Sequence, residues 1–245
     1  MKNYDDLHKL WSRAHAAGSP IKFTRNAVVY AALDRLSPGL TLDAGCGTGE
    51  YSIFLTNKGH KVTAFDPSSF AVRTLSENGG AALGIEAQTN TIDGFHSIEK
   101  FNNIVSIEVI EHIKQDQAAV RKLYSLLQER GTMIISTPAR AFLYSEADRI
   151  SGHYRRYSGS GFRKILINAG FSEVKIKNYG FPLLFIYLLM RKLFLSKIIT
   201  RHFSKKETPD RGMSTILSEL YPFMLAVDRI NIPFLGIGYV AICRK

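Results

Sequence analysis

Cysteine is nearly absent from this 245-residue sequence, which contains only Cys46 and Cys243. Small secreted domains depend on several disulfides, whereas a chain of this length buries enough surface to fold without any. Cys46 also lies within a glycine-rich turn, where a disulfide would disturb the backbone. We therefore expect two free thiols in a reducing compartment, which excludes the disulfide-rich secreted scaffolds.

The sequence also lacks a hydrophobic run long enough to cross a membrane. Its first residues, Met1–Asp6, are polar and unlike a secretory signal, so we expect a cytoplasmic protein. The apolar stretch Phe181–Met190 would form a helix of roughly 15 Å, about half of a hydrocarbon core of about 30 Å, and Arg191 and Lys192 follow it directly. The stretch is either a buried helix capping the site, or a peripheral contact with the inner face of a membrane.

Acidic residues are outnumbered: 21 Asp and Glu stand against 32 Lys and Arg, for a formal net charge of +11. Such an excess favours anionic partners, namely nucleic acid, phosphorylated substrates or an acidic membrane surface. The bases are concentrated in residues 191–206 and in a second group made of Arg149, Arg155, Arg156, Arg163 and Lys164. Either group is equally explained as a solvated face, so the charge does not choose among these partners.

Short apolar segments alternate with helical ones through most of the chain. We expect strands at 40–44, 61–65, 85–89, 104–107, 133–136, 174–177 and 238–243. Between them, the spacing of apolar residues predicts helices from Tyr51, through Val72 and Leu75, at 120–127 and at 162–168, the last ended by Gly170. Strand–helix–strand units of this length connect with a right-handed crossover, so the pattern predicts a doubly wound, mostly parallel seven-stranded sheet.

We expect a single domain over residues 1–245. Residues 1–37 read as a helical amino-terminal lid and residues 38–180 as the α/β core. Residues 181–236 form an apolar and basic helical insertion, and residues 237–245 hold the last strand.

A glycine-rich turn follows the first expected strand. The strand ends at Asp43, then Gly45, Gly47 and Gly49 precede a helix near Tyr51. Glycines at alternate positions allow a tight turn and let a ligand approach main-chain amides at a helix amino terminus. A dinucleotide turn reads G-x-G-x-x-G, and here the third glycine comes one residue early.

Asp66 closes the next expected strand. A carboxylate at this place accepts both hydroxyl protons of a ribose, and an acid suits a ribose without phosphate. Together with the turn, it predicts a nucleoside-containing ligand.

These residues carry a strong resemblance to the class I S-adenosylmethionine-dependent methyltransferases, a Rossmann-like fold, and within them to the branch with the ubiquinone-biosynthesis O-methyltransferases. The resemblance covers the whole core in the family's order, at 42–50, 60–68, 101–113 and 131–138. It implies a methyltransferase whose cofactor is S-adenosylmethionine.

The resemblance also implies which residues hold the cofactor. The glycine turn lies under its methionine part, Asp43 orients its amino group through the turn, and Asp66 with Pro67 holds the ribose. Arg25 is an additional contact. The remaining cofactor residues implied are Gly45, Gly47, Thr48, Gly49 and Ile107. The family's common Asp after the third strand is missing, so we expect backbone groups and a side chain such as Thr91 to hold the adenine.

Glu108-Val109-Ile110-Glu111-His112 follows the fourth expected strand, where the acceptor side of such a sheet opens. If a helical turn begins at Glu108, then Glu108, Glu111 and His112 converge on one point. Three interpretations stay open. His112 is a general base oriented by Glu111; the three residues bind a divalent cation such as Mg²⁺, as the resemblance implies; or they only brace the helix that follows.

A second polar segment, Gly152-His153-Tyr154-Arg155-Arg156-Tyr157-Ser158, follows the fifth expected strand. It is similar to a G-H-x-R-R-Y segment of bacterial methyltransferases of this type. Two guanidiniums and two phenols suit an anionic group and a ring, so Tyr154, Arg155, Arg156 and Tyr157 are candidate substrate residues. His153 is a second candidate base. Alternatively, the arginines pair with local acids such as Asp148.

The sequence thus predicts an S-adenosylmethionine-dependent methyltransferase that acts on a small-molecule or lipid-linked anionic acceptor, with O-methylation favoured over N- or C-methylation. A nucleic-acid acceptor is disfavoured because the chain lacks an Asn-Pro-Pro-aromatic or Asp-Pro-Pro-Tyr motif, a Pro-Cys nucleophile and an RNA-binding module. The other alternative is a non-catalytic protein that binds a membrane surface, and the intact glycine turn with Asp66 argues against it.

Overall fold

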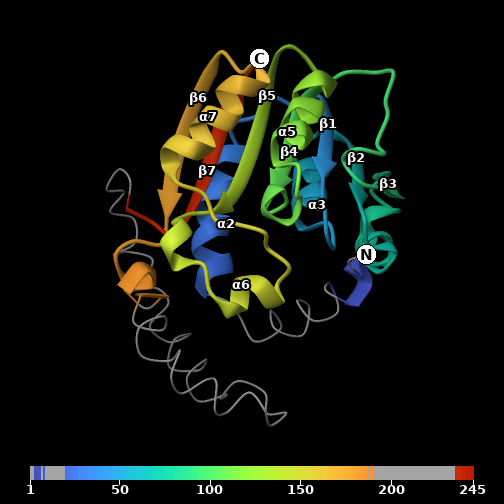
Figure 1. The fold of residues 1–245 in the computed structure, drawn as a ribbon. Coiled ribbons are helices and arrows are strands. Elements are labelled where there is room, and N and C mark those ends of the chain that lie inside the picture. Colours follow the sequence, from blue (N-terminus) through green and yellow to red (C-terminus); the bar gives the residue numbers. More distant parts are fainter. Residues whose placement is uncertain (1–2, 7, 9–19, 187, 190–234) are drawn as a thin grey trace.

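The computed structural model describes residues 3–6, 8, 20–186, 188, 189 and 235–245. Its centre is one seven-stranded sheet in the order β3-β2-β1-β4-β5-β7-β6 (Figure 1). The strands are β1 Leu40–Ala44, β2 Lys61–Asp66, β3 Glu86–Thr89, β4 Phe101–Ile107, β5 Leu127–Pro138, β6 Glu173–Tyr179 and β7 Gly238–Arg244. The first five are joined in parallel, and β7 runs antiparallel to both β5 and β6.

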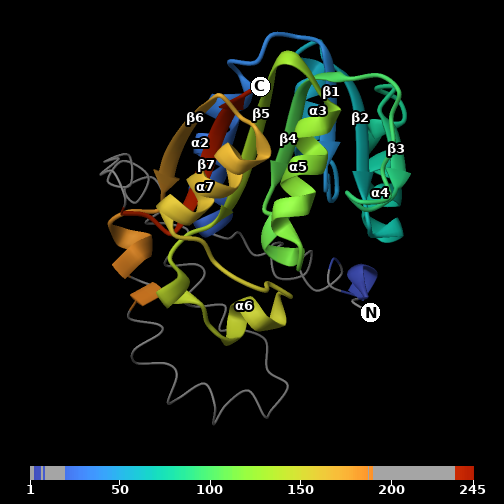
Figure 2. The same ribbon diagram turned by 45° about the horizontal axis from the view of Figure 1, so that its top comes forward.

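Helices cover both faces of this sheet. They are α2 Pro20–Leu33, α3 Glu50–Asn57, α4 Ser69–Leu75, α5 Asp116–Leu126, α6 Glu146–Ile150 and α7 Gly159–Ala169, with short helical turns η1 Ser76–Gly80, η2 Ile110–His112 and η3 Ala141–Leu143. Helices α5 and α7 lie on one face and α2 and α3 on the other, as both views show (Figures 1 and 2). The result is the doubly wound, mostly parallel α/β fold that the sequence predicted.

The chain order reverses between β1 and β4. From β1 the chain proceeds outward through β2 to β3, then returns to place β4 on the other side of β1. Connections that leave in opposite directions open a crevice at the carboxyl ends of these two strands, which is where α/β sheets bind their ligands. The fold therefore places the glycine turn after β1 beside the polar segment after β4.

Local sequence explains where α7 begins and ends. The hydroxyl of Ser158 accepts a hydrogen bond from the amide of Gly161 at the amino end. At the other end Gly170 takes a left-handed conformation with φ of 116°, which an L side chain rarely adopts. Between the caps, Phe162 and Leu166 recur at helical spacing and are fully buried against the sheet.

The expected amino-terminal lid divides into two parts. Helix α2 is packed on the sheet through Val29, Ala32 and Leu33, which are at most 2% exposed, and it contacts β5, β6 and β7. It is therefore a structural layer of the core. Residues 3–6 and 8 lie elsewhere, with Asp5 and His8 in contact with residues 66–70. The remaining domain boundaries stay predictions.

The apolar stretch after β6 begins as a helix with one buried side. Leu184 is 1% exposed and belongs to the same apolar cluster as Tyr179 and Ile237, while Ile186 is 47% exposed. Residues 190–234, which include the basic run 191–206, lie outside the described residues. In the described part of the chain, no helix has the length and apolar character needed to cross a bilayer.

Candidate active site

The glycine turn after β1 is built so that only glycine fits at two of its positions. The amides of Gly45 and Cys46 both donate to the carbonyl of Phe65, at 2.8 and 3.0 Å, which ties the turn to β2. Gly45 and Gly49 have φ of 82° and 85°. A Cβ atom at Gly49 would lie 2.0 Å from Cδ1 of Leu75, and one at Gly45 would lie 2.5 Å from Cγ2 of Val109. A side chain at either position would therefore have to displace Leu75 or Val109.

Asp43 lies under this turn and is 1% exposed. Its Oδ2 accepts a hydrogen bond of 2.6 Å from the hydroxyl of Ser52 in α3. Burial raises the pKa of Asp43 to about 7, although the bond from Ser52 opposes the shift. The carboxyl group therefore braces the turn against α3. Sequence reasoning missed Ser52, because no spacing rule links a strand end to the first turns of the next helix.

Asp66 lies at the end of β2 and joins the turn directly. One oxygen accepts from the amide of Gly47 and the other from the amide of Ser68, both at 2.9 Å. Its Oδ1 also lies 3.2 Å from Nε2 of His8. The neighbouring Asp5 accepts hydrogen bonds from the hydroxyls of Ser68 and Ser69 and from the amide of Phe70. The amino-terminal residues thus lie over the predicted ribose site, a contact that the sequence did not indicate.

The other predicted cofactor residues have varied surroundings. Thr48 and Pro67 are half-buried beside the turn and Asp66, and Ile107 is 8% exposed at the end of β4. Thr91 is exposed, and its hydroxyl accepts from the amide of Gly94, so it stabilises a local turn. These cofactor assignments stay predictions.

Glu108 does not begin a helical turn. Its φ of 58° is left-handed, and η2 starts only at Ile110, so the expected i, i+3, i+4 convergence with Glu111 and His112 does not form. Its carboxylate instead meets Arg25 from α2, with Nη1 and Oε2 3.8 Å apart. The structure therefore does not bring Glu108 together with Glu111 and His112, as the expected set of metal ligands requires.

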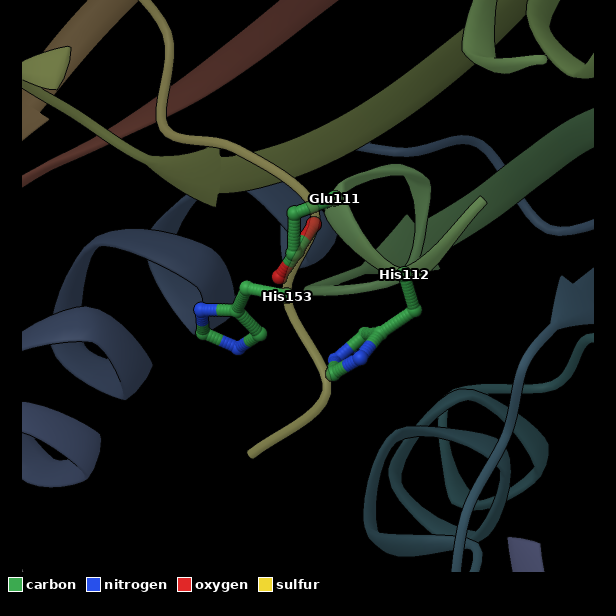
Figure 3. Close-up of side chains that lie close together, drawn as sticks. All are labelled: Glu111, His112 and His153. Carbon is green, nitrogen blue, oxygen red and sulfur yellow. The ribbon is translucent and has the colours of Figure 1, made fainter. Parts of the chain in front are cut away.

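Glu111, His112 and His153 come together instead, as Figure 3 shows. Their candidate ligand atoms lie within 4.8 Å of one another, and the two imidazole rings meet edge to face with centroids 4.6 Å apart. Glu111 is fully buried, and burial, helped by the charge of Glu108, raises its pKa well above the usual value. Within the described residues its Oε1 has no hydrogen-bond partner.

The main chain brings His153 to this cluster from forty residues away. The amide of Tyr154 donates to the carbonyl of Glu111 at 2.8 Å, and the hydroxyl of Tyr144 donates to the carbonyl of His153 at 2.8 Å. Nδ1 of His153 lies 2.9 Å from Oδ1 of Asp148. Since a carboxylate only accepts, Nδ1 carries the proton and Nε2 is the basic nitrogen.

Asp148 was overlooked as an orienting residue by sequence reasoning, which named it only as a partner for the arginines. It is 2% exposed and also accepts from Nε of Arg156 at 2.8 Å. Burial opposes its ionisation, but the His153 and Arg156 interactions outweigh burial and lower the pKa of Asp148 to about 2. The carboxylate is therefore charged at neutral pH and fixes the ring of His153.

The candidate substrate side chains make contacts within the protein, and the guanidinium carbon of Arg155 lies 6.0 Å from the centre of the Tyr154 ring. Arg155 pairs with Asp116 at 2.8 Å, and the hydroxyl of Tyr157 donates to the same carboxylate at 2.8 Å. The pair between Arg156 and Asp148 matches the alternative in which the arginines of this segment pair with local acids. Tyr154 has an exposed side chain. The segment thus braces the cluster, and its role toward substrate stays a prediction.

The cluster does not suit Mg²⁺. That ion prefers an octahedral set of oxygen ligands, and here two of the three side chains are imidazoles. Glu108, the carboxylate that would have made the set oxygen-rich, is held by Arg25 and by β5. We derive no step through a metal ion.

Comparison with known proteins agrees with this geometry. A family model described as a methyltransferase domain matches residues 21–176, more than half of the chain. Ubiquinone biosynthesis O-methyltransferase of Bradyrhizobium sp. (strain ORS 278) is 32% identical over 119 residues, which are 47% of this chain and 45% of that one. Its counterpart in Rhodopseudomonas palustris (strain BisB5) is 29% identical over 117 residues, with the same shares. The chain thus matches less than half the length of these relatives.

Solved structures share the fold at low sequence identity. A possible histamine N-methyltransferase of Thermotoga maritima aligns with a TM-score of 0.65 and 15% identity, over 97% of this chain and 95% of that one. Phosphoethanolamine N-methyltransferase 2 of Haemonchus contortus, solved with S-adenosyl-L-methionine, aligns with a TM-score of 0.62 and 16% identity, over 90% and 52%.

The fold and the matching family model define the class of methyltransferase domains. The chain belongs to the methyltransferase domain family.

Proposed function

We propose that the protein transfers a methyl group from S-adenosylmethionine to an oxygen atom of a small-molecule or lipid-linked anionic acceptor. The observation that carries the proposal is the hydrogen bond between Asp148 and His153 at the carboxyl edge of the sheet, beside His112 and Glu111. An oxygen nucleophile has a proton to lose, and this pair supplies an oriented base to take it.

The cofactor supplies the electrophilic methyl group and its own leaving group. Asp66 would hold the ribose hydroxyls of the cofactor, and the amides of the turn Gly45–Gly49 would hold its methionine part. The turn lies beside Val109 of the segment after β4, so a cofactor held by the turn would present its methyl group near that segment. The protein then has to align the acceptor and exclude water.

The transfer itself is a single displacement. S-adenosylmethionine would supply the methyl group to the acceptor oxygen and leave as S-adenosylhomocysteine, while Nε2 of His153 would take the proton of that oxygen. Asp148 stabilises the imidazolium that forms, as a carboxylate does for a histidine base. His112 lies beside His153 and is the second candidate for the base.

The net charge and the exposed apolar side chains support an acceptor that is anionic and lipid-linked. The net charge of +11 favours an anionic group. Phe142 and Ile186 are 53% and 47% exposed, and the ring of Phe142 contacts Phe185 in the apolar stretch. Exposed apolar side chains of this kind suit a lipid-linked acceptor presented at an acidic membrane surface.

The test is a screen for labelled methyl transfer with lipid, quinone and polysaccharide-precursor fractions. Wild-type protein is compared with His153→Asn, with His112→Asn and with His96→Asn, a control at an exposed histidine. We expect label on an acceptor oxygen, and a drop in turnover of about 10²- to 10⁴-fold when the base is removed. If the protein binds the cofactor but transfers label to none of the fractions, the result would instead favour the alternative of a non-catalytic protein that binds a membrane surface.

A further inference from the structure

A group of hydrogen-bond donors lies just beyond the end of β5, and none of the proposed reaction steps uses it. Arg140, the second residue after this strand, has a left-handed backbone with φ of 67°, which a non-glycine residue adopts only where its surroundings enforce it. Its amide donates to the carbonyl of Tyr157 at 2.8 Å, and its carbonyl accepts from the amide of Leu143 at 2.9 Å. The main chain therefore fixes the direction in which the Arg140 side chain leaves the sheet.

The guanidinium of Arg140 has spare hydrogen-bonding capacity. Among the described residues it makes one hydrogen bond, from Nε to the carbonyl of Gly236 at 3.4 Å, and its buried Nη2 has no hydrogen-bond partner there. Arg155 and Arg156, by contrast, each pair with a buried aspartate at 2.8 Å. Of these three arginines, Arg140 is therefore the one whose charge is left for an anion.

The phenol of Tyr239 lies at the amino end of α7, near this guanidinium. Tyr239 is 1% exposed, and its ring stacks on that of Phe162 in the first turn of the helix, with centroids 6.1 Å apart. Burial raises the pKa of Tyr239, and the charge of Arg140 and the amide of Gly159 oppose the shift. Both influences weaken with distance, so both groups lie near the hydroxyl oxygen. The hydroxyl has no hydrogen-bond partner in the part of the chain that the structure describes.

The amino end of α7 adds main-chain donors to this group. Its first turn holds no acidic residue, and the cap from Ser158 uses the amide of Gly161. The amides of Gly159 and Ser160 have no acceptor inside the helix, and the positive end of the helix dipole lies at the same place. Buried donors without an acceptor cost free energy of folding, so their convergence indicates a place where a ligand supplies the acceptor.

This group of donors lies close to the proposed base. Thr137, three residues before Arg140, donates to Oε2 of Glu111 at 3.4 Å. Arg156 also donates to the carbonyl of Ala139, the residue before Arg140, at 3.4 Å. Because three residues of extended chain span at most about 10 Å, an anion bound by Arg140 lies on the order of 10 Å from Glu111.

We propose that Arg140, Tyr239 and the amino end of α7 bind a phosphate group of the acceptor, while His153 takes the proton of a hydroxyl elsewhere on the same molecule. A guanidinium, a phenol and helix amides that face one point suit a phosphate, which carries several acceptor oxygens on one atom. The phosphate belongs either to a lipid headgroup or to a soluble phosphate ester. The inference rests on the proposed function, because it assigns the anionic group of that acceptor.

The test measures phosphate binding itself, so its readout does not depend on methyl transfer. Inorganic phosphate and diphosphate are titrated into wild-type protein, Arg140→Met, Arg140→Lys and Tyr239→Phe, and phosphorus NMR line widths give the dissociation constants. Arg121→Met is the control for the loss of one exposed charge, and Tyr124→Phe, on the same helix α5, is the control for the loss of a phenol hydroxyl. Phosphatidylcholine vesicles with and without phosphatidic acid are added as competitors.

We expect Arg140→Met to weaken phosphate binding by about ten- to a hundredfold, the value of one hydrogen bond to a charged group. Arg140→Lys recovers part of the affinity because it restores the charge. Tyr239→Phe weakens binding by about two- to tenfold, and since it keeps the buried ring it tests the site even if Arg140→Met fails to fold. Both controls bind phosphate as the wild type does.

The vesicles separate the two sources of phosphate. Displacement of inorganic phosphate by vesicles with phosphatidic acid assigns the site to a lipid headgroup, and phosphate binding that the vesicles leave unchanged assigns it to a soluble phosphate ester. Wild-type affinity in both Arg140→Met and Tyr239→Phe, or no saturable phosphate binding by the wild type, would overturn the subsite and leave the methyltransferase proposal standing. The expected phosphate binding without methyl transfer to any fraction would contradict the proposed function and leave the phosphate site in place.

Discussion

Nδ1 of His153 lies 2.9 Å from Oδ1 of Asp148, and the same oxygen accepts from Nε of Arg156 at 2.8 Å. The buried carboxylate of Asp148 therefore orients His153, the candidate base, and also holds Arg156. The arrangement makes the local segment and the proposed chemistry depend on a single side chain.

We predict that Asp148→Asn lowers both stability and methyl transfer. The pKa of Asp148 is about 2, below that of an unfolded aspartate, so the ionised group stabilises the fold above about pH 4 and this contribution is lost as the pH falls toward 2. The free energy of unfolding should fall by about 2 kcal/mol at pH 7, and the difference should shrink at pH 3. Urea unfolding at both pH values measures it, with the exposed Glu146→Gln on the same helix as control.

Asp43 should give a pH dependence of the opposite sign. Its pKa of about 7 lies above that of an unfolded aspartate, so the folded state binds the proton more tightly. The associated stability is complete below about pH 4 and is lost as the pH rises through 7, by up to about 1.4 kcal/mol per pH unit. Relative to wild type, Asp43→Asn should therefore become more stable between pH 5 and 8. Parallel profiles for the two proteins would refute the shift; the exposed Asp34→Asn serves as reference.

Asp66→Ala should weaken cofactor binding through the ribose. Removing the carboxylate takes away the predicted partner of the ribose hydroxyls. It also leaves the amide of Gly47 without the carboxylate oxygen to which it donates a hydrogen bond of 2.9 Å. We expect a loss of about tenfold or more for S-adenosylhomocysteine and also for adenosine, which keeps the ribose but has no charged end. Undiminished affinity for both ligands would show that the ribose lies elsewhere.

Gly49→Ala should destabilise the fold more than an alanine at a comparable glycine. Gly49 has φ of 85° and Gly84 has φ of 72°, but only at Gly49 would a Cβ atom strike a neighbour, 2.0 Å from Cδ1 of Leu75. Gly84→Ala reports the conformational cost alone, about 1 kcal/mol. The clash should add about 1–3 kcal/mol at Gly49. Thermal unfolding of both variants measures the difference, and equal losses would mean that Leu75 moves away freely.

The fold and the position of the glycine turn next to Asp66 could be predicted because their signals are local. Asp43, Gly45, Gly47 and Gly49 lie within one turn, and Asp66 follows at the end of the next strand. Right-handed crossovers leave few ways to assemble such units, so apolar spacing was enough to predict a doubly wound, mostly parallel sheet.

The acceptor side was predicted less well, and Glu108 shows why. Helical spacing brings residues i, i+3 and i+4 together only if every residue between them is helical. Two hydrogen bonds from its amide to Ser136 hold Glu108 at φ of 58°, and that partner is 28 residues away in the sequence. No periodicity reports such a contact.

By itself, the sequence determined the doubly wound sheet, the glycine turn and the acid that follows it, because strand alternation and turn chemistry act over a few residues. Only the tertiary structure decided that His153 joins Glu111 and His112, that Asp148 orients it, and that Glu108 faces Arg25. Those contacts depend on strand register and on main-chain hydrogen bonds between distant segments, and these form only when the whole sheet is assembled.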